Sequence, residues 1–388
     1  MNIPTVGIRP RFASPGCGEC TKCLPICPGY SVDARRPAEP AATVEGSGAE
    51  EFGPSLELWE GYACDSKVRF KASSGGLLSA IAQYCLEHEG MRFVLHTGAD
   101  PEQPWLNRTV KSTNRAELLS RSGSRYAPSS PCGDLQDVEA SDGECVFIGK
   151  PCDAAAVDML VRQRPQLEKK LGLILTFFCA GTPSTEGTLD LLTSLNVDLD
   201  SVDGVRYRGE GWPGRFNVRY GADNDEKSLS YADSWGRLTA YRPLRCNLCP
   251  DGLGRLADLA CGDAWARFSA ANDPGRSIVI VRTERGRRIL HAAMAAKYVK
   301  LEPVDSRAVL ASQQHLLQRR RELYGRLLGM RLLGVPTPKF LGFSLPRSWI
   351  RQPLSIQARS VLGTMRRCLQ RGKWRRTTAL TVDEPARG

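Results

Sequence analysis

The sequence predicts an α/β fold with α+β features: a mixed-sheet core between a cysteine-rich N-terminal segment and a basic helical C-terminal region. From about Leu58 onward, apolar runs of a strand's length alternate with helical patterns, which is typical of such a core. Residues 205–221, VRYRGEGWPGRFNVRYG, instead predict an antiparallel pair with Gly and Pro in the turn. The 388 residues are 41% hydrophobic and 24% charged, which excludes a wholly disordered chain.

Composition divides the chain into four parts. Residues 1–30 form a cysteine-rich unit, and residues 31–56, rich in Ala, Pro, Glu and Gly, are typical of a linker. Residues 57–310 form the α/β core, and residues 311–388 form the basic helical region and tail. No run approaches the ~20 apolar residues of a spanning helix. The start of the chain has no apolar leader, so we expect a cytoplasmic location.

The first elements of the core have clear boundaries in the sequence. Residues 73–90, SSGGLLSAIAQYCLEHEG, predict a helix that Ser73 or Ser74 caps and Gly90 ends. Residues 92–96 predict a strand. The RSIVIVRT and ERGRRILHAAMAAK segments predict a last strand and helix of the core.

Two units in the middle of the core resemble each other. ECVFIGKPCDAAAVDML and LGLILTFFCAGTPSTEGTLDLL each predict a strand, a tight loop and a helix. Each places a cysteine, Cys152 or Cys179, just past the carboxyl end of its strand. Ligands of open α/β sheets bind at that edge, so we expect both thiols near a binding site.

The N-terminal unit carries the clearest chemical motif. Cys17, Cys20, Cys23 and Cys27 follow the spacing C-x2-C-x2-C-x3-C-P, as in ferredoxins. A cubane iron–sulfur cluster needs four thiolates from a short loop, and this spacing provides them. Cys27 either completes that cluster or serves another one. A zinc knot is the alternative, because zinc also binds C-x2-C pairs.

A second group of cysteines lies in the core. Cys246 and Cys249 form a C-x2-C pair followed by Pro, and Cys152 is the third candidate ligand. Cys179 and Cys261 compete for the fourth place, and a buried structural thiol is the alternative for each of these two. With 14 cysteines and no need for disulfides in a cytosolic chain, metal or redox chemistry is the favoured interpretation.

Positive charge is concentrated near the C-terminus. Residues 319–376 hold fifteen Lys or Arg and one acid, Glu322, among apolar residues that include Trp349 and Trp374. Such a mixture suits an anionic membrane surface or an acidic partner. A solvated pair of basic helices packed on the core is the alternative. No nucleic-acid motif occurs, so we expect no nucleic-acid partner.

Taken in order, the motifs resemble those of a known family, the beta subunits of coenzyme F420 hydrogenase/dehydrogenase, whose relatives include the 7-hydroxymethyl chlorophyll a reductases. The resemblance covers most of residues 10–270 and, more loosely, continues to about residue 345. It rests on CGECTKCLPICPG, SSGGLLSAI, GSRYAP, VFIGKPCDAAA, LTFFCAG, VRYRGEGWPG and RCNLCPDGLGRLADLACGDAW.

The resemblance implies an iron–sulfur flavoprotein with one or two 4Fe–4S clusters beside FAD, and coenzyme F420 or another small molecule as substrate. Helix-opening Ser and Gly residues suit a dinucleotide's pyrophosphate, and Lys150 could stabilise reduced flavin. Lys150 and Asp153 are the weak catalytic candidates; Lys150 as a surface lysine and Asp153 as a helix N-cap are the alternatives. The implied flavin residues are Ser73, Ser74, Gly75, Gly76, Gly123, Ser124, Arg125, Tyr126, Gly149, Lys150 and Pro151.

Some features depart from the family pattern. Arg125 stands where relatives often have Lys, and Cys261 falls where many have another residue. The basic stretch after Arg347 has no counterpart in the motifs above. Because no further paired C-x2-C sets occur, the chain cannot itself activate hydrogen and needs a redox partner protein as electron source or sink. A zinc-stabilised binding protein and an electron-relay subunit without its own turnover are the alternative functions.

Overall fold

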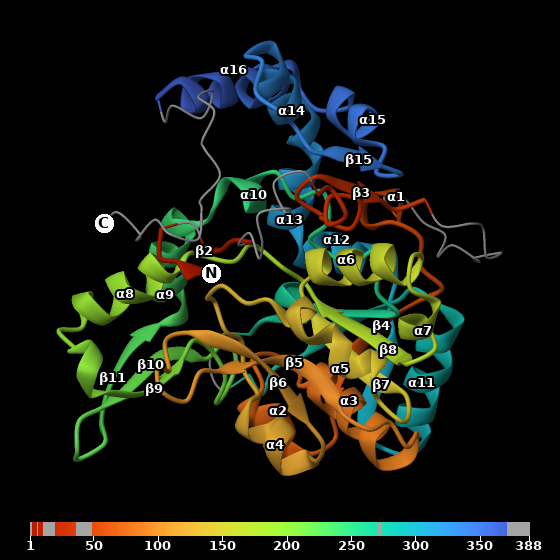
Figure 1. Ribbon diagram of the computed structural model, residues 1–388, viewed down its shortest axis with the longest axis vertical. Helices are drawn as coiled ribbons and strands as arrows, with labels where there is room; N and C mark the ends of the chain where they lie inside the picture. Colours follow the sequence, from red (N-terminus) through yellow and green to blue (C-terminus); the bar gives the residue numbers. More distant parts are fainter. Residues whose placement is uncertain (1, 6, 11–19, 36–48, 270–272, 371–388) are drawn as a thin grey trace.

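The computed structural model describes residues 2–5, 7–10, 20–35, 49–269 and 273–370. Cys17 and Trp374, both named above, lie outside the described residues. The expected mixed α/β architecture is confirmed, with a large mixed sheet at its centre (Figure 1).

Eight strands form the central sheet, in the order β14-β4-β13-β12-β8-β7-β5-β6. The four inner strands β12, β8, β7 and β5 run parallel, and the outer neighbours pair antiparallel. All the carboxyl ends of the parallel strands therefore meet at one edge. The strands are β4 (Glu57–Ala63), β5 (Val94–Ala99), β6 (Asn107–Ser112), β7 (Cys145–Gly149), β8 (Leu171–Phe177), β12 (Leu259–Asp263), β13 (Ser277–Val281) and β14 (Val299–Pro303).

Helices cover both faces of this sheet. Alternate residues of one strand enter different clusters: Val279 packs with the helices α3 (Leu77–His88) and α11 (Glu284–Ala295), whereas Ile278 and Ile280 pack against α12 (Ser306–Ser312) and α13 (Gln314–Arg321). This alternation gives a three-layer arrangement. Further helices of the core are α2 (Ser66–Lys71), α4 (Arg115–Ser120), α5 (Leu135–Glu139), α6 (Pro151–Val161) and α7 (Pro165–Glu168).

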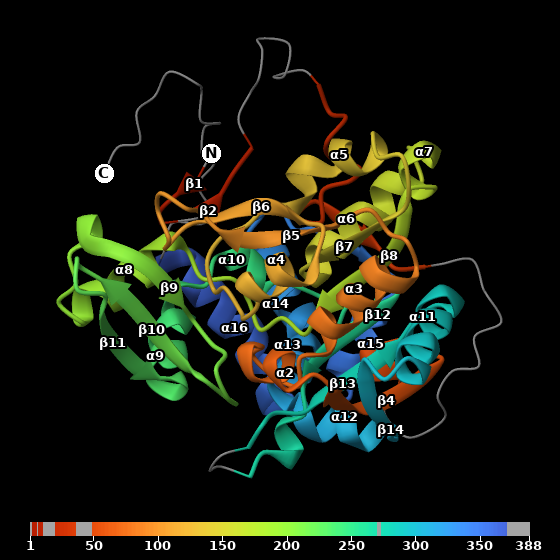
Figure 2. The ribbon, with the colours of Figure 1, turned by 90° about the horizontal axis from the view of Figure 1, so that it is seen from below.

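The predicted antiparallel pair forms part of a second, smaller sheet. Strands β9 (Val202–Arg206), β10 (Arg215–Tyr220) and β11 (Asp225–Ser230) pair antiparallel, as the glycine-rich turn indicated. Helices α8 (Thr185–Ser194) and α9 (Tyr231–Leu238) pack on it, and Figure 2 shows this unit beside the large sheet. The short helix α10 (Leu244–Asn247) then carries Cys246 back toward the core.

The start of the chain is attached at several points. Strands β1 (Asn2–Ile3) and β2 (Gly7–Ile8) form a hairpin, and β3 (Ser31–Asp33) pairs parallel with β15 (Lys339–Leu341). The predicted linker differs from the structure at both ends: Val32 is buried, and so is Phe52 of α1 (Ala49–Phe52). Apolar residues at these two places pack into the core despite the polar composition between them.

The basic region is mainly helical up to residue 370, where the described part of the chain ends. Helices α14 (Leu323–Leu332), α15 (Leu345–Ile350) and α16 (Leu354–Gln370) gather at one end of the long axis, away from the central sheet (Figure 1). They enclose a separate apolar cluster with residues of β3 and β15. None of the helices among the described residues combines the length and apolar character needed to cross a bilayer.

Candidate flavin and iron–sulfur site

A large cavity opens at the carboxyl edge of the parallel strands. Its volume is about 1050 Å³, at the upper end of the range of ~300–1,000 Å³ for ligand pockets. Gly149 ends β7, Phe177 ends β8 and Asp263 ends β12, and all three line it. The cavity therefore lies where the fold class predicts a binding site.

Most of the residues implied for flavin binding line this cavity. Gly75 and Pro151 are the exceptions, since neither of them lines it. The loop Ser73–Gly76 brings its backbone to the wall, while Lys150 reaches it from the end of β7. The residues that line it are Ser73, Ser74, Gly76, Gly123, Ser124, Arg125, Tyr126, Gly149 and Lys150. The fold thus brings together, at one cavity, segments that the resemblance had grouped although they lie more than 70 positions apart in sequence.

The predicted serine cap of α3 is wrong. Gly76, with φ +77°, is the N-cap, and no side chain caps the helix. The two hydroxyls are engaged elsewhere: Ser73 Oγ accepts a hydrogen bond from the backbone N–H of Ser124, and Ser74 Oγ donates to the carbonyl of Arg276. The first N–H groups of α3 are therefore left without a side-chain partner, beside the cavity.

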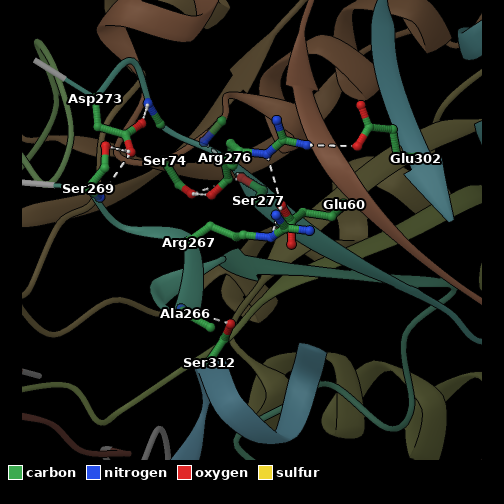
Figure 3. A network of polar contacts seen from close by, with 12 residues as sticks. Glu60, Ser74, Ala266, Arg267, Ser269, Asp273, Arg276, Ser277, Glu302 and Ser312 are labelled. Atoms are coloured by element: carbon green, nitrogen blue, oxygen red, sulfur yellow. Dashed lines mark hydrogen bonds and ion pairs between the residues drawn. The ribbon is translucent and has the colours of Figure 1, made fainter. Parts of the chain in front are cut away.

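A polar network holds this loop on the sheet (Figure 3). Ser277 Oγ accepts from the backbone N–H of Gly75 at 2.8 Å and donates to Ser74 Oγ at 2.8 Å. The neighbouring Arg276 binds the buried carboxylate of Glu60 at 2.8 Å. Arg276 and Ser277, where β13 begins, thus fix the loop through hydrogen bonds to Ser74 and Gly75.

Replacing Gly75 with alanine is expected to disturb this loop. An added Cβ would lie 2.6 Å from the Gly61 carbonyl oxygen and 2.8 Å from the Ser277 backbone nitrogen, and neither backbone can move freely. We expect a loss of stability of about 1–3 kcal/mol and a lower flavin content per purified chain. The control is Gly236→Ala in α9, where an added Cβ meets nothing within 4 Å and which should be neutral or slightly stabilising.

Arg125 has a structural task in addition to its place at the cavity wall. Its guanidinium donates to Asn107 Oδ1 and to the carbonyl oxygens of Val205, Pro104 and Leu106. It therefore ties the β5–β6 hairpin to the small sheet. Its donors are used within the protein, so its contribution to an anionic ligand is its charge rather than a free hydrogen-bonding fork.

Lys150 and Asp153 form a buried pair at the start of α6. Lys150 Nζ lies 2.7 Å from Asp153 Oδ2 and donates to Ser129 Oγ at 2.8 Å. Burial disfavours the charged form of the ammonium, but Asp153 and the neighbouring thiols raise the pKa of Lys150 above its ordinary value. Lys150 is thus a fixed cation at the cavity wall, which suits charge stabilisation better than proton transfer.

Asp153 occupies a different helix position from the one considered in the sequence. It is the N3 residue of α6, and its carboxylate accepts from the backbone N–H of Lys150, the N-cap, at 2.9 Å. The N-cap alternative for Asp153 is therefore wrong, because Pro151 begins the helix three residues earlier than that alternative requires.

Four core cysteines approach one another, and Cys179 among them lines the cavity. The backbone N–H of Cys179 donates to the Gly252 carbonyl at 2.9 Å, close in sequence to Cys249. Cys246 Sγ accepts from the backbone N–H of Thr182 at 3.4 Å. Burial is the main cause of the raised pKa values of Cys152 and Cys249. A negative charge on Cys249 raises the pKa of Cys152 further, and one on Cys179 does the same for Cys249, so these thiols are electrostatic neighbours. Three separate segments thus deliver four thiols to one region.

Cys261 is placed differently from these four. It lies on β12 in the main apolar cluster and lines the cavity. Burial raises the pKa of Cys261 to about 12, with no charged neighbour contributing. Of the two competitors for the fourth position, Cys179 is therefore the one whose surroundings include other cysteines.

The N-terminal motif meets the core through its last cysteine. A Cβ at Gly29 would lie 3.5 Å from Cys27 Sγ and 3.6 Å from the guanidinium carbon of Arg245. Burial lowers the pKa of Arg245, but negative charges on Cys152, Cys27 and Cys246 outweigh it and raise that pKa above its ordinary value. Arg245 therefore lies near Cys27 and also near the core thiols Cys152 and Cys246. Cys20 and Cys23 are exposed.

The donor set fits an iron–sulfur cluster in its chemistry, although the thiols are not closed around a metal position. Among the described residues, no group of three or more His, Cys, Asp and Glu side chains is gathered tightly enough to hold a metal ion. The donors are all thiols, a backbone N–H already points at Cys246, and Arg319 donates to the carbonyls of Cys179 and Ala180. Cationic neighbours and N–H donors of this kind stabilise a negatively charged cluster.

A second polar group at the cavity surrounds Asp263, which the sequence offered only as a weak candidate for proton transfer. Arg208 forms a bidentate ion pair with Asp263, at 2.7 and 3.1 Å, and its side chain is 3% exposed. Trp212 Nε1 donates to the same carboxylate at 2.7 Å, and the ring of Trp265 stacks on that of Tyr231. Only the spacing of Arg208 and Trp212 in the glycine-rich turn hinted that this hairpin reaches the site.

His96, also at the cavity, makes the stability depend on pH. Burial and the Arg121 charge lower the pKa of His96 from 6.5 to about 4, while Ser112 Oγ lies 2.8 Å from its Nε2. Because the folded state holds the neutral ring, its contribution is complete above pH 6.5 and is lost as the pH falls toward 4. The difference corresponds to about 3 kcal/mol. Urea unfolding across this range should show that slope, and His96→Gln should reduce it.

Comparison with known proteins identifies the family. Residues 58–136 match the family described as "Coenzyme F420 hydrogenase/dehydrogenase, beta subunit N-term", and residues 142–307 match its C-terminal counterpart. The chain belongs to this beta subunit family. The resemblance inferred from the motifs is thereby confirmed, and the matched segments contain the cavity-lining loops and the core cysteines.

Individual members of the family are distant in sequence. The chain is 24% identical over 247 residues to the F420-dependent formate dehydrogenase subunit beta of Methanocaldococcus jannaschii, covering 64% of this chain but only 62% of that relative. It is 23% identical to the coenzyme F420 hydrogenase subunit beta of Methanosarcina barkeri, covering 62% and 79% of the two chains. These relatives are oxidoreductase subunits by name, and the chain spans less than two thirds of the length of the first of them.

A solved structure shares the fold of the family. A chain from the F420-reducing [NiFe] hydrogenase complex of Methanosarcina barkeri superposes with a TM-score of 0.55 at 21% identity. The superposition covers 72% of this chain and 91% of that chain. The chain described here and that chain of the hydrogenase complex therefore share a fold.

Proposed function

We propose that the chain is an iron–sulfur flavoprotein oxidoreductase that passes electrons between 4Fe–4S clusters, FAD and coenzyme F420 or another small organic substrate. One observation carries the proposal. The loops implied for flavin binding line a cavity of about 1050 Å³, and Cys179, one of four core thiols that influence one another electrostatically, lines it too. The names of the relatives supply the substrate class, since they are F420-dependent enzymes.

Several groups of the chain would hold the flavin. The N–H groups at the start of α3, left without a side-chain cap, would bind its pyrophosphate, and the backbone of Gly123 and Ser124 would face the same ligand. Lys150 would hold a positive charge beside reduced flavin. When bound, FAD would supply the exchange between two-electron and one-electron chemistry.

Cys152, Cys179, Cys246 and Cys249 would hold a cluster next to that ligand. Without a metal these thiols would stay protonated, because burial raises the pKa of Cys249 to about 12. Iron binding must therefore displace their protons. Arg319 and Lys150 would offset the negative charge of the thiolates. The N-terminal motif, of which Cys20, Cys23 and Cys27 are described, would hold a second cluster with Cys17.

A partner protein is part of this proposal. The chain would receive or deliver electrons through a redox partner or neighbouring subunit, which is supported by its likeness in fold to a chain of a hydrogenase complex, and it would work in the cytoplasm. The exposed Cys20 and Cys23 would place the second cluster near the surface, where a partner can reach it. Turnover by the isolated chain would exclude the pure relay alternative.

Anaerobic purification tests the cofactor assignment. Iron, acid-labile sulfide and flavin are quantified per chain, and about four irons indicate one cubane whereas about eight indicate two. A brown protein with extractable FAD and F420-dependent turnover is the expected result. A colourless protein with stoichiometric zinc and no flavin would overturn the proposal in favour of the zinc-stabilised binding protein.

A further inference from the structure

Helix α16 turns its apolar side chains to solvent. Leu354, Leu362 and Leu369 are 80%, 63% and 55% exposed. With Ala358 and Met365 they follow helical spacing, so the five share one face of the helix. At 17 residues the helix is about 25 Å long. An amphipathic helix in a water-soluble protein usually buries such a face.

The buried face of the same helix is made of small and polar residues. Ser360, Thr364 and Cys368 are the buried positions of α16. They allow a close approach to α14, where a Cβ at Gly325 would meet Ser360 Oγ at 1.9 Å and one at Gly329 would meet the Val361 carbonyl oxygen at 2.6 Å. The glycines therefore fix the orientation of α16. The leucine face is presented outward by tight packing of the opposite face.

Positive charge surrounds the leucine face. From residue 323 to residue 370 the chain has eight Lys or Arg and no Asp or Glu. Arg359 and Arg366 lie at the edge of the face by helical spacing, and both are exposed. Arg359 has Glu322 at 3.6 Å but remains 70% exposed. Figure 1 shows α16 at one end of the molecule, with the central sheet well separated from it.

We propose that this surface, the leucine face of α16 with Arg359 and Arg366, docks the protein on an anionic lipid membrane. Leucines on one face and arginines beside them are the arrangement by which a helix lies in the plane of a lipid interface. Leu354, 80% exposed, can insert among lipid acyl chains. Residues 323–370, which contain no Asp or Glu, would not repel the anionic lipid headgroups. The proposal stands independently of the cofactors.

Sedimentation with lipid vesicles tests the proposal on the full-length protein. Wild-type protein should bind vesicles of phosphatidylcholine with one-third phosphatidylglycerol, should bind phosphatidylcholine alone much more weakly, and should be released by salt. Leu354→Gln with Leu362→Gln should lower the partition coefficient about tenfold or more. Arg359→Gln with Arg366→Gln should lower it about fivefold per arginine.

Two matched controls accompany these variants. Phe70 of α2 is 56% exposed at the opposite end of the molecule, so Phe70→Gln should bind like the wild type. Arg219 of β10 is exposed, so Arg219→Gln should also bind normally. The circular dichroism spectrum and melting temperature of each variant establish that it is folded.

Other occupants of the leucine face predict different results. If the wild type fails to bind anionic vesicles, or if the leucine variants bind as well as it does, the proposal is wrong. A wild-type dimer that the leucine variants convert to monomer would assign the face to a second copy. Binding that appears only after removal of residues 371–388 would assign it to the chain's own C-terminal segment.

Discussion

Replacing Cys246 with alanine is expected to remove one iron–sulfur cluster and leave the flavin in place. Iron and sulfide should each fall by about four per chain, because a cubane does not persist with a missing thiolate. The fold should survive, since Cys246 is only partly buried on the short helix α10. Metal and sulfide analysis after anaerobic purification, with flavin measured on the same sample, gives the result.

Cys261 provides the matched control for that experiment. It is a buried cysteine that lines the cavity but lies among apolar side chains on β12. Cys261→Ala should therefore keep the full iron content. Loss of iron in Cys261→Ala, with retention in Cys179→Ala, would reverse the choice between the two competitors and contradict the ligand set proposed above.

Replacing Asp263 with alanine is expected to cost more stability than any other single change considered for this chain. The variant leaves the guanidinium of Arg208, 3% exposed, without its bidentate partner and leaves Trp212 Nε1 without an acceptor. Removing one member of a buried ion pair typically costs about 3–5 kcal/mol, because the other charge stays buried. Urea unfolding of wild type and variant measures the difference.

Two further variants separate charge burial from loss of packing. Arg208→Met with Asp263→Leu removes both charges, and should lose less stability than Asp263→Ala alone. Asp142→Ala breaks an ion pair with Arg92 in which both side chains are more than half exposed, and should change stability by less than about 1 kcal/mol. Equal losses in all three would contradict the assignment of the cost to the buried charge.

Periodicity and motifs predicted the core well because they depend on local physical chemistry. The strands β7, β8 and β13 and the helices that follow them each have an apolar run followed by a helical pattern, and the structure has them at those places. The position of Cys152 and Cys179 at neighbouring strand ends followed from the same pattern, because β7 and β8 are parallel neighbours. The alternation indicated a mixed α/β core, but it did not give the order of the strands in the sheet.

Long-range pairings could not be read from the sequence. The Ser73–Gly76 loop is typical of a capped helix by composition, but the serines bond to segments 51 and 202 residues away. Val32 and Phe52 lie in segments of linker composition, yet partners far along the chain bury them. The pair of Arg208 and Asp263 joins residues 55 positions apart. In each case tertiary contacts outweigh the local preference.

The parallel pairing of β3 with β15 sets an order of events during synthesis. The strand that follows Cys27 finds its partner only after roughly 300 further residues have been made, which takes on the order of 15–60 s at ribosomal speed. Until then β3 has no partner strand among the described residues. Final attachment of the segment that follows Cys27 must therefore wait for translation of nearly the whole described chain.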